Sequence, residues 1–290
     1  MNRARAVATT PTVVIEAEPD TMWARLKAVW RYRGFYGFLF KEITTRRSRG
    51  TLLGFWWLIL RPLIPAAALI FVFSSVRPLD TGDAVPYPVF FLSGYIPWRL
   101  FQSAMLQLPR TLGWTASIMR KTYFPRLLVP LAGFGNTLIE LAVLSVAFGI
   151  VVGVTTWNSG MMPLQLGWQT LWLIPSFVAA LLFALAVGMV VGVVALFFRD
   201  IIFSTRFVVQ VCMFLTPVVY PITWVPETYR WLVYVLNPMA QVVTVSRWAL
   251  TGQGAFEPAF VMLSYGSILV ILAASLTFFF RAEALLGDQM

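Results

Sequence analysis

Long apolar runs separated by short polar segments form the dominant pattern of this sequence. A membrane-spanning helix needs about 20 predominantly apolar residues, and six runs meet that requirement. The six runs cover, roughly, residues 53–76, 88–108, 128–155, 169–197, 203–222 and 259–280. The pattern predicts an all-α integral membrane protein with six transmembrane helices, in a transmembrane domain that covers residues 51–290.

Two other segments have an amphipathic pattern. Residues 23–50 mix aromatic and basic side chains, which is typical of a helix lying in the lipid headgroup plane. We predict such an interfacial helix after a flexible cytoplasmic N-terminus at residues 1–22. The helix is either a lipid anchor alone or also part of a surface for a cytoplasmic partner.

The second amphipathic segment, residues 223–254, lies between the fifth and sixth apolar runs. It is rich in Trp and Pro and too interrupted to be one span, so we predict one or two short helices that re-enter the membrane or line a cavity. Such helices are candidates for an external gate, and a passive plug that packs the molecule is the alternative. The candidate gate residues are Trp224, Trp231, Tyr234, Asn237 and Pro238.

Composition supports the membrane assignment and removes several kinds of chemistry. Of 290 residues, 59% are hydrophobic and 12% are charged, and the mean hydropathy is +0.78. The chain has no histidine and a single cysteine, Cys212, so a disulfide within it is excluded and we expect no metal site and no cofactor. The first 20 residues lack the apolar run of a signal peptide, and we expect no cleavage.

The basic residues indicate the orientation in the membrane. Ten Lys and Arg residues precede residue 53, four lie between the second and third runs, two between the fourth and fifth, and one after the sixth. The opposite side holds Arg77, Arg230 and Arg247. The positive-inside rule therefore predicts that both termini are cytoplasmic. A basic cytoplasmic rim accounts for the net charge of +10, so we expect membrane lipids, and no nucleic acid, as partners.

Several motifs resemble one family over nearly the whole chain from about residue 40. The motifs are RRSRGTLLGFWWLILRPL, FFLSGYIPWRLFQSAM, IMRKTYFPRLLVPLAG, FFRDI and TPVVYPITWVPETYRWLVYVLNPMAQVV. They resemble the permease subunits of bacterial ABC exporters for lipid-linked polysaccharides such as O-antigen, capsule and teichoic acid. The resemblance implies a homodimer of six-helix subunits in the bacterial inner membrane. It also implies two copies of a separate cytoplasmic subunit that binds ATP and Mg, and a lipid-linked polysaccharide as substrate.

The sequence contains no recognisable nucleotide-binding motif. It contains no G-x-x-x-x-G-K-[ST] loop and no Gly-rich dinucleotide motif. ATP hydrolysis is therefore expected on the partner subunit, and this chain is expected to have no catalytic residues.

A basic, aromatic segment between the second and third runs resembles the coupling helix that seats in a groove of the ATPase. Aromatic side chains are frequent interface anchors, a proline stiffens the chain, and charges fix orientation. The alternative is that the basic residues only follow the positive-inside rule. The segment's candidate coupling residues are Arg120, Lys121, Tyr123, Phe124, Pro125 and Arg126.

Three ionisable residues, Arg61, Arg99 and Glu140, lie inside predicted spans. At 1.5 Å per residue they lie at about 12, 14 and 18 Å from the cytoplasmic boundary, so all three can meet at one level. One interpretation is a structural pair of Glu140 with one arginine, because buried charges are usually paired. In the other, the spare arginine faces the translocation path and meets the pyrophosphate of the substrate.

Aromatic side chains in the first two spans are further candidates for the path. Ring faces contact sugars without requiring one hydroxyl pattern, and the related permeases are similar to one another in lining a sugar path with rings. Lipid contact or core packing is the alternative for each ring. The candidates are Trp56, Trp57, Phe71, Phe73, Trp98 and Phe101.

Three other functions remain to be weighed. A related permease for a drug or lipid is favoured by a narrow, aliphatic path. A membrane-embedded glycan transferase or phosphotransferase needs paired acids or a metal, and the predicted spans contain only Glu140. A secondary transporter is disfavoured because no carboxylate or histidine relay and no inverted repeat are evident.

Overall fold

The structure, a computed structural model, is mostly helical and contains no β-strand in the part of the chain that it describes. That part comprises residues 30, 34, 37, 38, 40–42, 56–76, 85–119, 128–198, 200–254 and 256–287. The α-helices are α3 (Trp56–Phe71), α4 (Tyr87–Met119), α5 (Leu128–Ser159), α6 (Leu173–Phe197), α7 (Asp200–Leu215), α8 (Glu227–Leu236), α9 (Pro238–Thr251) and α10 (Pro258–Gly287). A π-helical turn (Val72–Val76) extends α3, and 3-10 turns precede α6 (Trp168–Trp172) and α8 (Ile222–Trp224).

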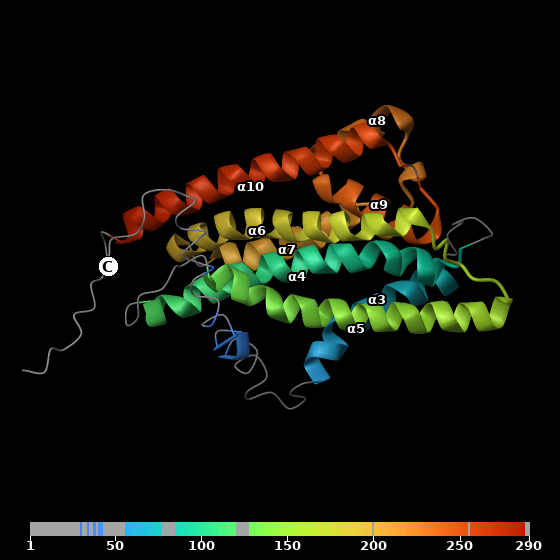
Figure 1. Cartoon of the computed structure of the whole chain (residues 1–290), viewed down its shortest axis with the longest axis horizontal. Helices are drawn as coiled ribbons and strands as arrows, with labels where there is room; N and C mark the ends of the chain where they lie inside the picture. Colours follow the sequence, from blue (N-terminus) through green and yellow to red (C-terminus); the bar gives the residue numbers. More distant parts are fainter. Residues whose placement is uncertain are drawn as a thin grey trace, which may run out of the picture.

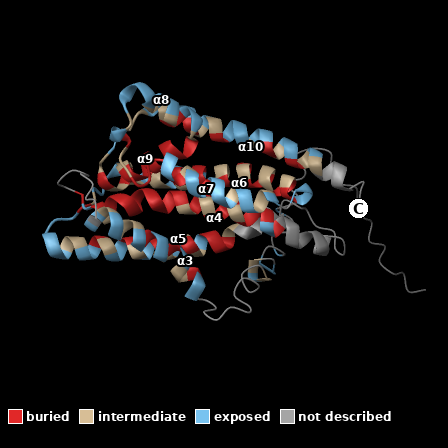
Figure 2. Ribbon diagram, turned by 180° about the vertical axis from the view of Figure 1, so that it is seen from behind, coloured by how far each residue is buried: buried red, intermediate tan, exposed pale blue. Residues whose placement is uncertain are grey.

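Helix α4 is the centre of the bundle. The long helices α4, α5, α6 and α10 run along the long axis of the molecule (Figure 1). α4 packs against α3, α5, α6, α7 and α9, and much of it is buried (Figure 2). These five helices therefore share α4 as a common wall.

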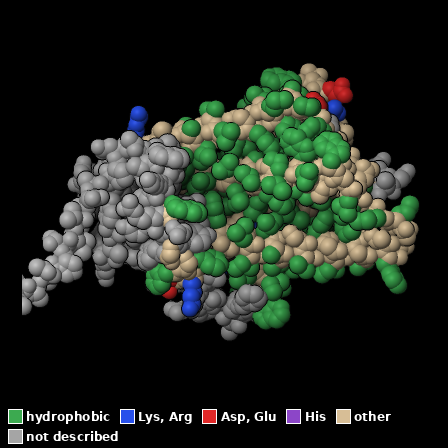
Figure 3. All heavy atoms as spheres, viewed as in Figure 1, with side chains coloured by type: hydrophobic (Ala, Val, Ile, Leu, Met, Phe, Trp, Pro, Cys, Tyr) green, Lys and Arg blue, Asp and Glu red, His purple; other side chains and the backbone are tan. Residues whose placement is uncertain are grey.

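Among the described residues, four helical segments are long and apolar enough to cross a membrane. They are Trp56–Ser75, Phe134–Ser159, Trp168–Phe197 and Pro258–Ala282. Apolar side chains cover most of the face seen in Figure 3, and the coloured charges lie toward its two ends. A multi-pass α-helical membrane protein is confirmed, and the count of six spans stays a prediction.

Two of the predicted spans have different ends in the structure. The second, predicted at 88–108, is the 33-residue helix α4, which continues through Pro109 to Met119. The fifth, predicted at 203–222, is the 16-residue helix α7, which ends at Leu215. A turn at Thr216–Tyr220 follows α7, because Pro217 has no N–H with which to continue the helical hydrogen bonds.

Two short helices, α8 and α9, connect the fifth and sixth predicted spans; that they re-enter the membrane or form a gate stays a prediction. Asn237 separates them and caps α9, since its side chain accepts a hydrogen bond from the Met239 N–H at 3.1 Å. Pro238 occupies the first position of α9, where its missing N–H has no cost. The Asn237 amide also donates to the Thr216 hydroxyl at 2.7 Å, so one residue links both helices to the end of α7.

Candidate functional site

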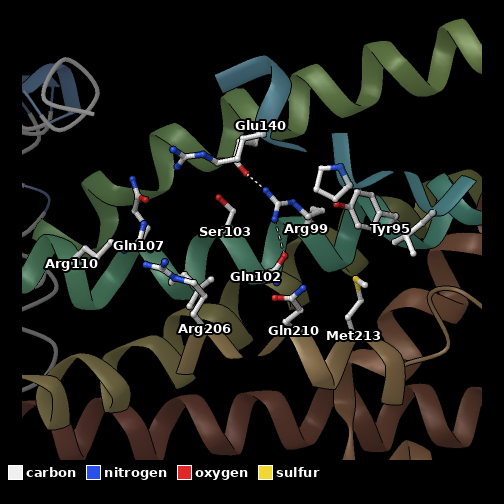
Figure 4. Close-up of a pocket in the computed structure, with 14 residues that line it drawn as sticks. Tyr95, Arg99, Gln102, Ser103, Gln107, Arg110, Glu140, Arg206, Gln210 and Met213 are labelled. Atoms are coloured by element: carbon white, nitrogen blue, oxygen red, sulfur yellow. Dashed lines mark hydrogen bonds and ion pairs between the residues drawn. The ribbon is translucent and has the colours of Figure 1, made fainter. Parts of the chain in front are cut away.

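A polar cavity of about 520 Å³ lies between α3, α4, α5 and α7. Figure 4 shows its labelled side chains, with Arg99 directed at Glu140 and with Arg206 and Gln210 projecting from α7. The lining residues are Arg61, Pro65, Leu69, Tyr95, Arg99, Gln102, Ser103, Leu106, Gln107, Arg110, Glu140, Arg206, Gln210 and Met213. The cavity therefore contains four arginines and one carboxylate.

Helical periodicity brings these polar groups together. On α4, Arg99, Gln102 and Ser103 are separated by three and four positions, which places them on one face of the helix. On α7, Arg206 and Gln210 are four positions apart. The two polar faces line the same cavity, and the opposite faces of α4 and α7 are apolar.

An ion pair fixes one arginine of the cavity. Arg99 Nη2 lies 2.9 Å from Glu140 Oε2, and the two side chains are 15% and 4% exposed. Arg99 Nη1 also donates to Gln102 Oε1 at 2.8 Å. The Nε–H of Arg99 is buried and has no hydrogen-bond partner in the described part of the chain. Arg99 is thus the partner of Glu140, and it retains one free donor.

Arg61 and Arg206 differ from Arg99 in having no ion pair with any described residue. Both are exposed and both line the cavity. The Arg61 guanidinium carbon lies 6.0 Å from the centre of the Trp57 ring, at the outer limit of a cation–π contact. Arg61 is therefore the spare arginine that the sequence anticipates.

The candidate path rings do not lie with these charges. Trp98 and Phe101 are buried on the other face of α4, and Phe101 stacks on Phe183 of α6 at 5.2 Å. Phe73 contacts Tyr87, with ring centres 5.8 Å apart. A helix displays its side chains all round its axis, so residues at the same depth can face different compartments.

The remaining path candidates lie on α3. Trp56, Trp57 and Phe71 are exposed, at 63%, 38% and 65%. None of the six candidate rings lines the polar cavity. Their role in a sugar path stays a prediction.

A second cavity, apolar and about 690 Å³ in volume, lies on the far side of α4 and α7. Trp98 and Phe101 line it, together with side chains of α6, α7, α8 and α9 that include the gate candidates Asn237 and Pro238. α4 and α7 thus separate a cationic compartment from an apolar one.

The gate candidates differ in burial: some are exposed at the surface and others are buried. Trp224 and Trp231 are exposed, at 54% and 52%, whereas Tyr234 is buried against Phe260 with ring centres 5.2 Å apart. Burial, and then the nearby Glu257 carboxylate, raise the pKa of the Tyr234 phenol. Tyr234 is therefore neutral over the physiological range and acts as a packing residue of α8.

Arg247, on α9, was counted among the outside charges and is a buried residue in the structure. It donates to the carbonyl oxygens of Phe90 at 3.3 Å, Pro217 at 3.0 Å and Val218 at 2.9 Å. Its guanidinium carbon lies 3.8 Å from the centre of the Phe90 ring. Arg247 is thus a structural cation that satisfies carbonyls where α7 has ended.

Several predicted groups fall outside the described residues or find no counterpart within them. The candidate coupling residues Arg120, Lys121, Tyr123, Phe124, Pro125 and Arg126 lie outside the described residues, as do residues 1–22. Of the interfacial helix, the structure describes Trp30, Gly34 and residues 37, 38 and 40–42, all helical. Within the described residues, no group of three or more Cys, Asp or Glu side chains could hold a metal ion.

Sequence reasoning missed Arg206, Gln210 and Arg110 as residues of the cavity. Both arginines were assigned to the basic rim, although Arg206 lies within the fifth predicted run, 203–222, and the two residues belong to α7 and α4. The signal that could have found the first was the four-residue spacing of Arg206 and Gln210 in an otherwise apolar run, which puts two polar side chains on one helical face.

Comparison with known proteins gives one family and several relatives. The sequence profile described as "ABC-2 type transporter" matches residues 36–251. An O-antigen export system permease protein RfbA of Klebsiella pneumoniae is 30% identical over 156 residues, which are 53% of this chain and 56% of the relative. The protein of the same name in Myxococcus xanthus is 25% identical over 181 residues, 61% of this chain and 64% of the relative. The chain thus spans less than two thirds of the length of these relatives.

Proposed function

Because this chain belongs to the ABC-2 type transporter family, we propose that it is the membrane subunit of an ATP-driven exporter of a lipid-linked polysaccharide. The substrate is an O-antigen-like or related envelope glycan, carried from the cytoplasm across the bacterial inner membrane. The names of the relatives support this substrate class. The observation that carries the proposal is the cationic cavity, since ionisable groups inside a membrane protein mark transport paths by default.

The proposed topology has six spans with both termini in the cytoplasm. The four apolar segments supply four of them, and α4 and α7 supply the second and fifth. Both of these helices have a polar face toward the cavity, and α7, which has 16 residues, would cross together with the turn at Thr216–Tyr220. The orientation follows from the excess of basic residues in the predicted cytoplasmic segments.

The proposed assembly is a homodimer with two copies of a cytoplasmic ATP-binding subunit, which holds the ATP and Mg. Supporting this division, the chain contains no phosphate-cradling motif. Residues 120–126 are the proposed coupling segment. They connect α4 to α5, the two helices that hold Arg99 and Glu140. A displacement of this segment by the ATPase would therefore move two of the helices that line the cavity.

The proposed path runs beside the polar cavity toward α8, which acts as an external gate helix. α8 is exposed on one side and joined to α7 through Asn237 and Thr216. Movement of α7 would therefore reach Asn237, where α8 and α9 meet. Because α9 is buried and α8 is mostly exposed, we expect α8 to be the helix that moves.

Reconstitution of the complex tests this function. The chain is purified with its co-purifying ATPase, and the partner is identified by mass. We expect no ATP hydrolysis by the chain alone, hydrolysis by the complex, and ATP-dependent transfer of a lipid-linked glycan into proteoliposomes. The control is a complex whose ATPase has an inactivated nucleotide site. Nucleotide turnover by the pure chain, or glycan transfer unaffected by the inactive ATPase, would contradict the proposal.

A further inference from the structure

We propose that the polar cavity binds a phosphate or diphosphate ester carried by a lipid, with Arg61 and Arg206 as the principal ligands. The inference rests on the proposed function and names the part of the substrate that this site recognises. Its first basis is charge. Four arginines face one glutamate around the cavity, and that glutamate already pairs with Arg99.

Arg61 and Arg206 lack any acidic partner among the described residues. Arg61 and Arg206 face one cavity, where like charges repel each other, and an anion entering the cavity would relieve that repulsion. Guanidinium groups bind phosphate oxygens through two parallel hydrogen bonds. The ligand class that fits two unpaired arginines is therefore a phosphoryl anion.

Arg99 contributes from a fixed position. Glu140 and Gln102 hold its two terminal nitrogens, while its buried Nε–H has no described partner. Gln210 and Ser103 add neutral polar groups to the same lining. The cavity thus combines two unpaired arginines, Arg61 and Arg206, with a donor of fixed orientation on Arg99. This arrangement favours binding of one anionic group over loosely bound counterions.

The size of the cavity favours a head group rather than a sugar chain. A volume of about 520 Å³ falls within the usual range for small ligands, about 300–1,000 Å³. Arg61 and Glu140 both lie inside predicted spans, about 12 and 18 Å from the predicted cytoplasmic boundary at 1.5 Å per residue.

Binding of defined probes to the full chain in phosphatidylcholine nanodiscs tests the site. The probes are inorganic pyrophosphate, farnesyl diphosphate and farnesol, and the readout is tryptophan fluorescence, because Trp57 lies beside Arg61. We expect both diphosphates to bind and farnesol not to bind. Arg61→Gln and Arg206→Gln should each weaken binding by about tenfold or more, as loss of a charge-assisted hydrogen bond does.

Two arginines outside the cavity serve as matched controls, Arg230 on α8 and Arg281 on α10. Arg230→Gln and Arg281→Gln should leave the affinity for both diphosphates unchanged. Equal losses in all four variants, or full binding by Arg61→Gln and Arg206→Gln, would overturn the proposal and indicate nonspecific attraction to a basic surface. The affinities for both diphosphates are measured at two salt concentrations. Salt should weaken binding to a basic surface more than binding to a partly buried site, because it screens exposed charges more strongly.

A last arm identifies the source of the phosphoryl group. If phosphatidylglycerol in the nanodisc competes with farnesyl diphosphate, a phospholipid head group is the resident ligand; if it does not, the lipid-linked substrate is. The outcome is also separable from the proposed function. Diphosphate binding without glycan transfer in proteoliposomes would refute the function alone, and glycan transfer with unaltered binding in the arginine variants would refute the site alone.

Discussion

The cavity beside α3 and the core around α9 each hold an arginine inside a membrane protein, and they satisfy it in different ways. Arg99 faces an open cavity and pairs with a carboxylate. Arg247 is sealed and donates to three backbone carbonyls, with no described acid beside it. The two regions therefore use arginine differently. Arg247 donates hydrogen bonds to backbone carbonyls that have no helical N–H partner, whereas the arginines of the cavity are accessible to a ligand.

Arg247→Leu should have the largest effect on stability. The carbonyl oxygens of Phe90, Pro217 and Val218 would lose their donor, and each buried acceptor left unpaired costs about 1–3 kcal/mol. We expect the free energy of unfolding to fall by about 4 kcal/mol or more, measured by denaturant titration in detergent. A loss under about 1 kcal/mol would mean that water or another donor already serves these carbonyls.

Glu140→Gln tests the paired arginine of the cavity. It leaves Arg99 without its carboxylate, and breaking a buried pair costs about 3–5 kcal/mol. Because Gln keeps the volume and one acceptor, we expect the lower end, about 3 kcal/mol. The double variant with Arg99→Gln should recover part of the loss.

The matched control for Glu140→Gln is Glu227→Gln on α8. Glu227 also pairs with an arginine, Arg230 at 3.3 Å, but its side chain is 87% exposed. An exposed pair contributes about 0–1 kcal/mol, so Glu227→Gln should have little effect. Equal losses from the two variants would show that the cavity is no more sheltered than the surface.

Gly94→Ala should destabilise the α9 core without touching the cavity. An added Cβ at Gly94 would lie 2.5 Å from Arg247 Nη2 and 3.0 Å from Val243 Cγ1, so Arg247 would have to move. We expect a loss of about 2 kcal/mol, as in other overpacked cores. Gly149→Ala on α5 is the control, because its Cβ would meet nothing within 4 Å; it should be neutral or slightly stabilising.

Asn237→Ala should have the smallest of these effects on stability. It removes the cap of α9, which costs about 1 kcal/mol, and the hydrogen bond to Thr216. Asn237→Asp keeps the cap acceptor and removes only the donor to Thr216. A loss in Asn237→Asp as large as in Asn237→Ala would assign the effect to the link with α7 rather than to the cap.

The sequence predicted the long apolar helices well because their signal is local. The predicted starts of the third and sixth runs, at 128 and 259, agree with α5 and α10 to within one residue. The end of α7 was missed because Thr216 and Pro217 interrupt a run that remains apolar to Val219. Polarity alone does not distinguish a chain that turns inside the membrane from one that continues through it.

The candidate site was only partly predictable. Counting residues predicted that Arg61, Arg99 and Glu140 can meet at one level, and all three line one cavity. Which arginine pairs with Glu140 depends on the rotation of α3 and α4 about their axes, and an apolar run carries little information about rotation. The same ambiguity explains why Trp98, beside Arg99 in sequence, faces the other cavity.

Water access to the two regions is the most direct test of the contrast between them. Single cysteines are introduced in a Cys212→Ala background, as Arg61→Cys and Arg206→Cys for the cavity and Ala240→Cys for α9, where Ala240 is 0% exposed. Their reaction with a charged, membrane-impermeant thiol reagent is followed by mass in nanodiscs. We predict rapid labelling at positions 61 and 206 and none at position 240. Protected cysteines at 61 and 206, or equally fast labelling at 240, would contradict an open cationic cavity beside a sealed core.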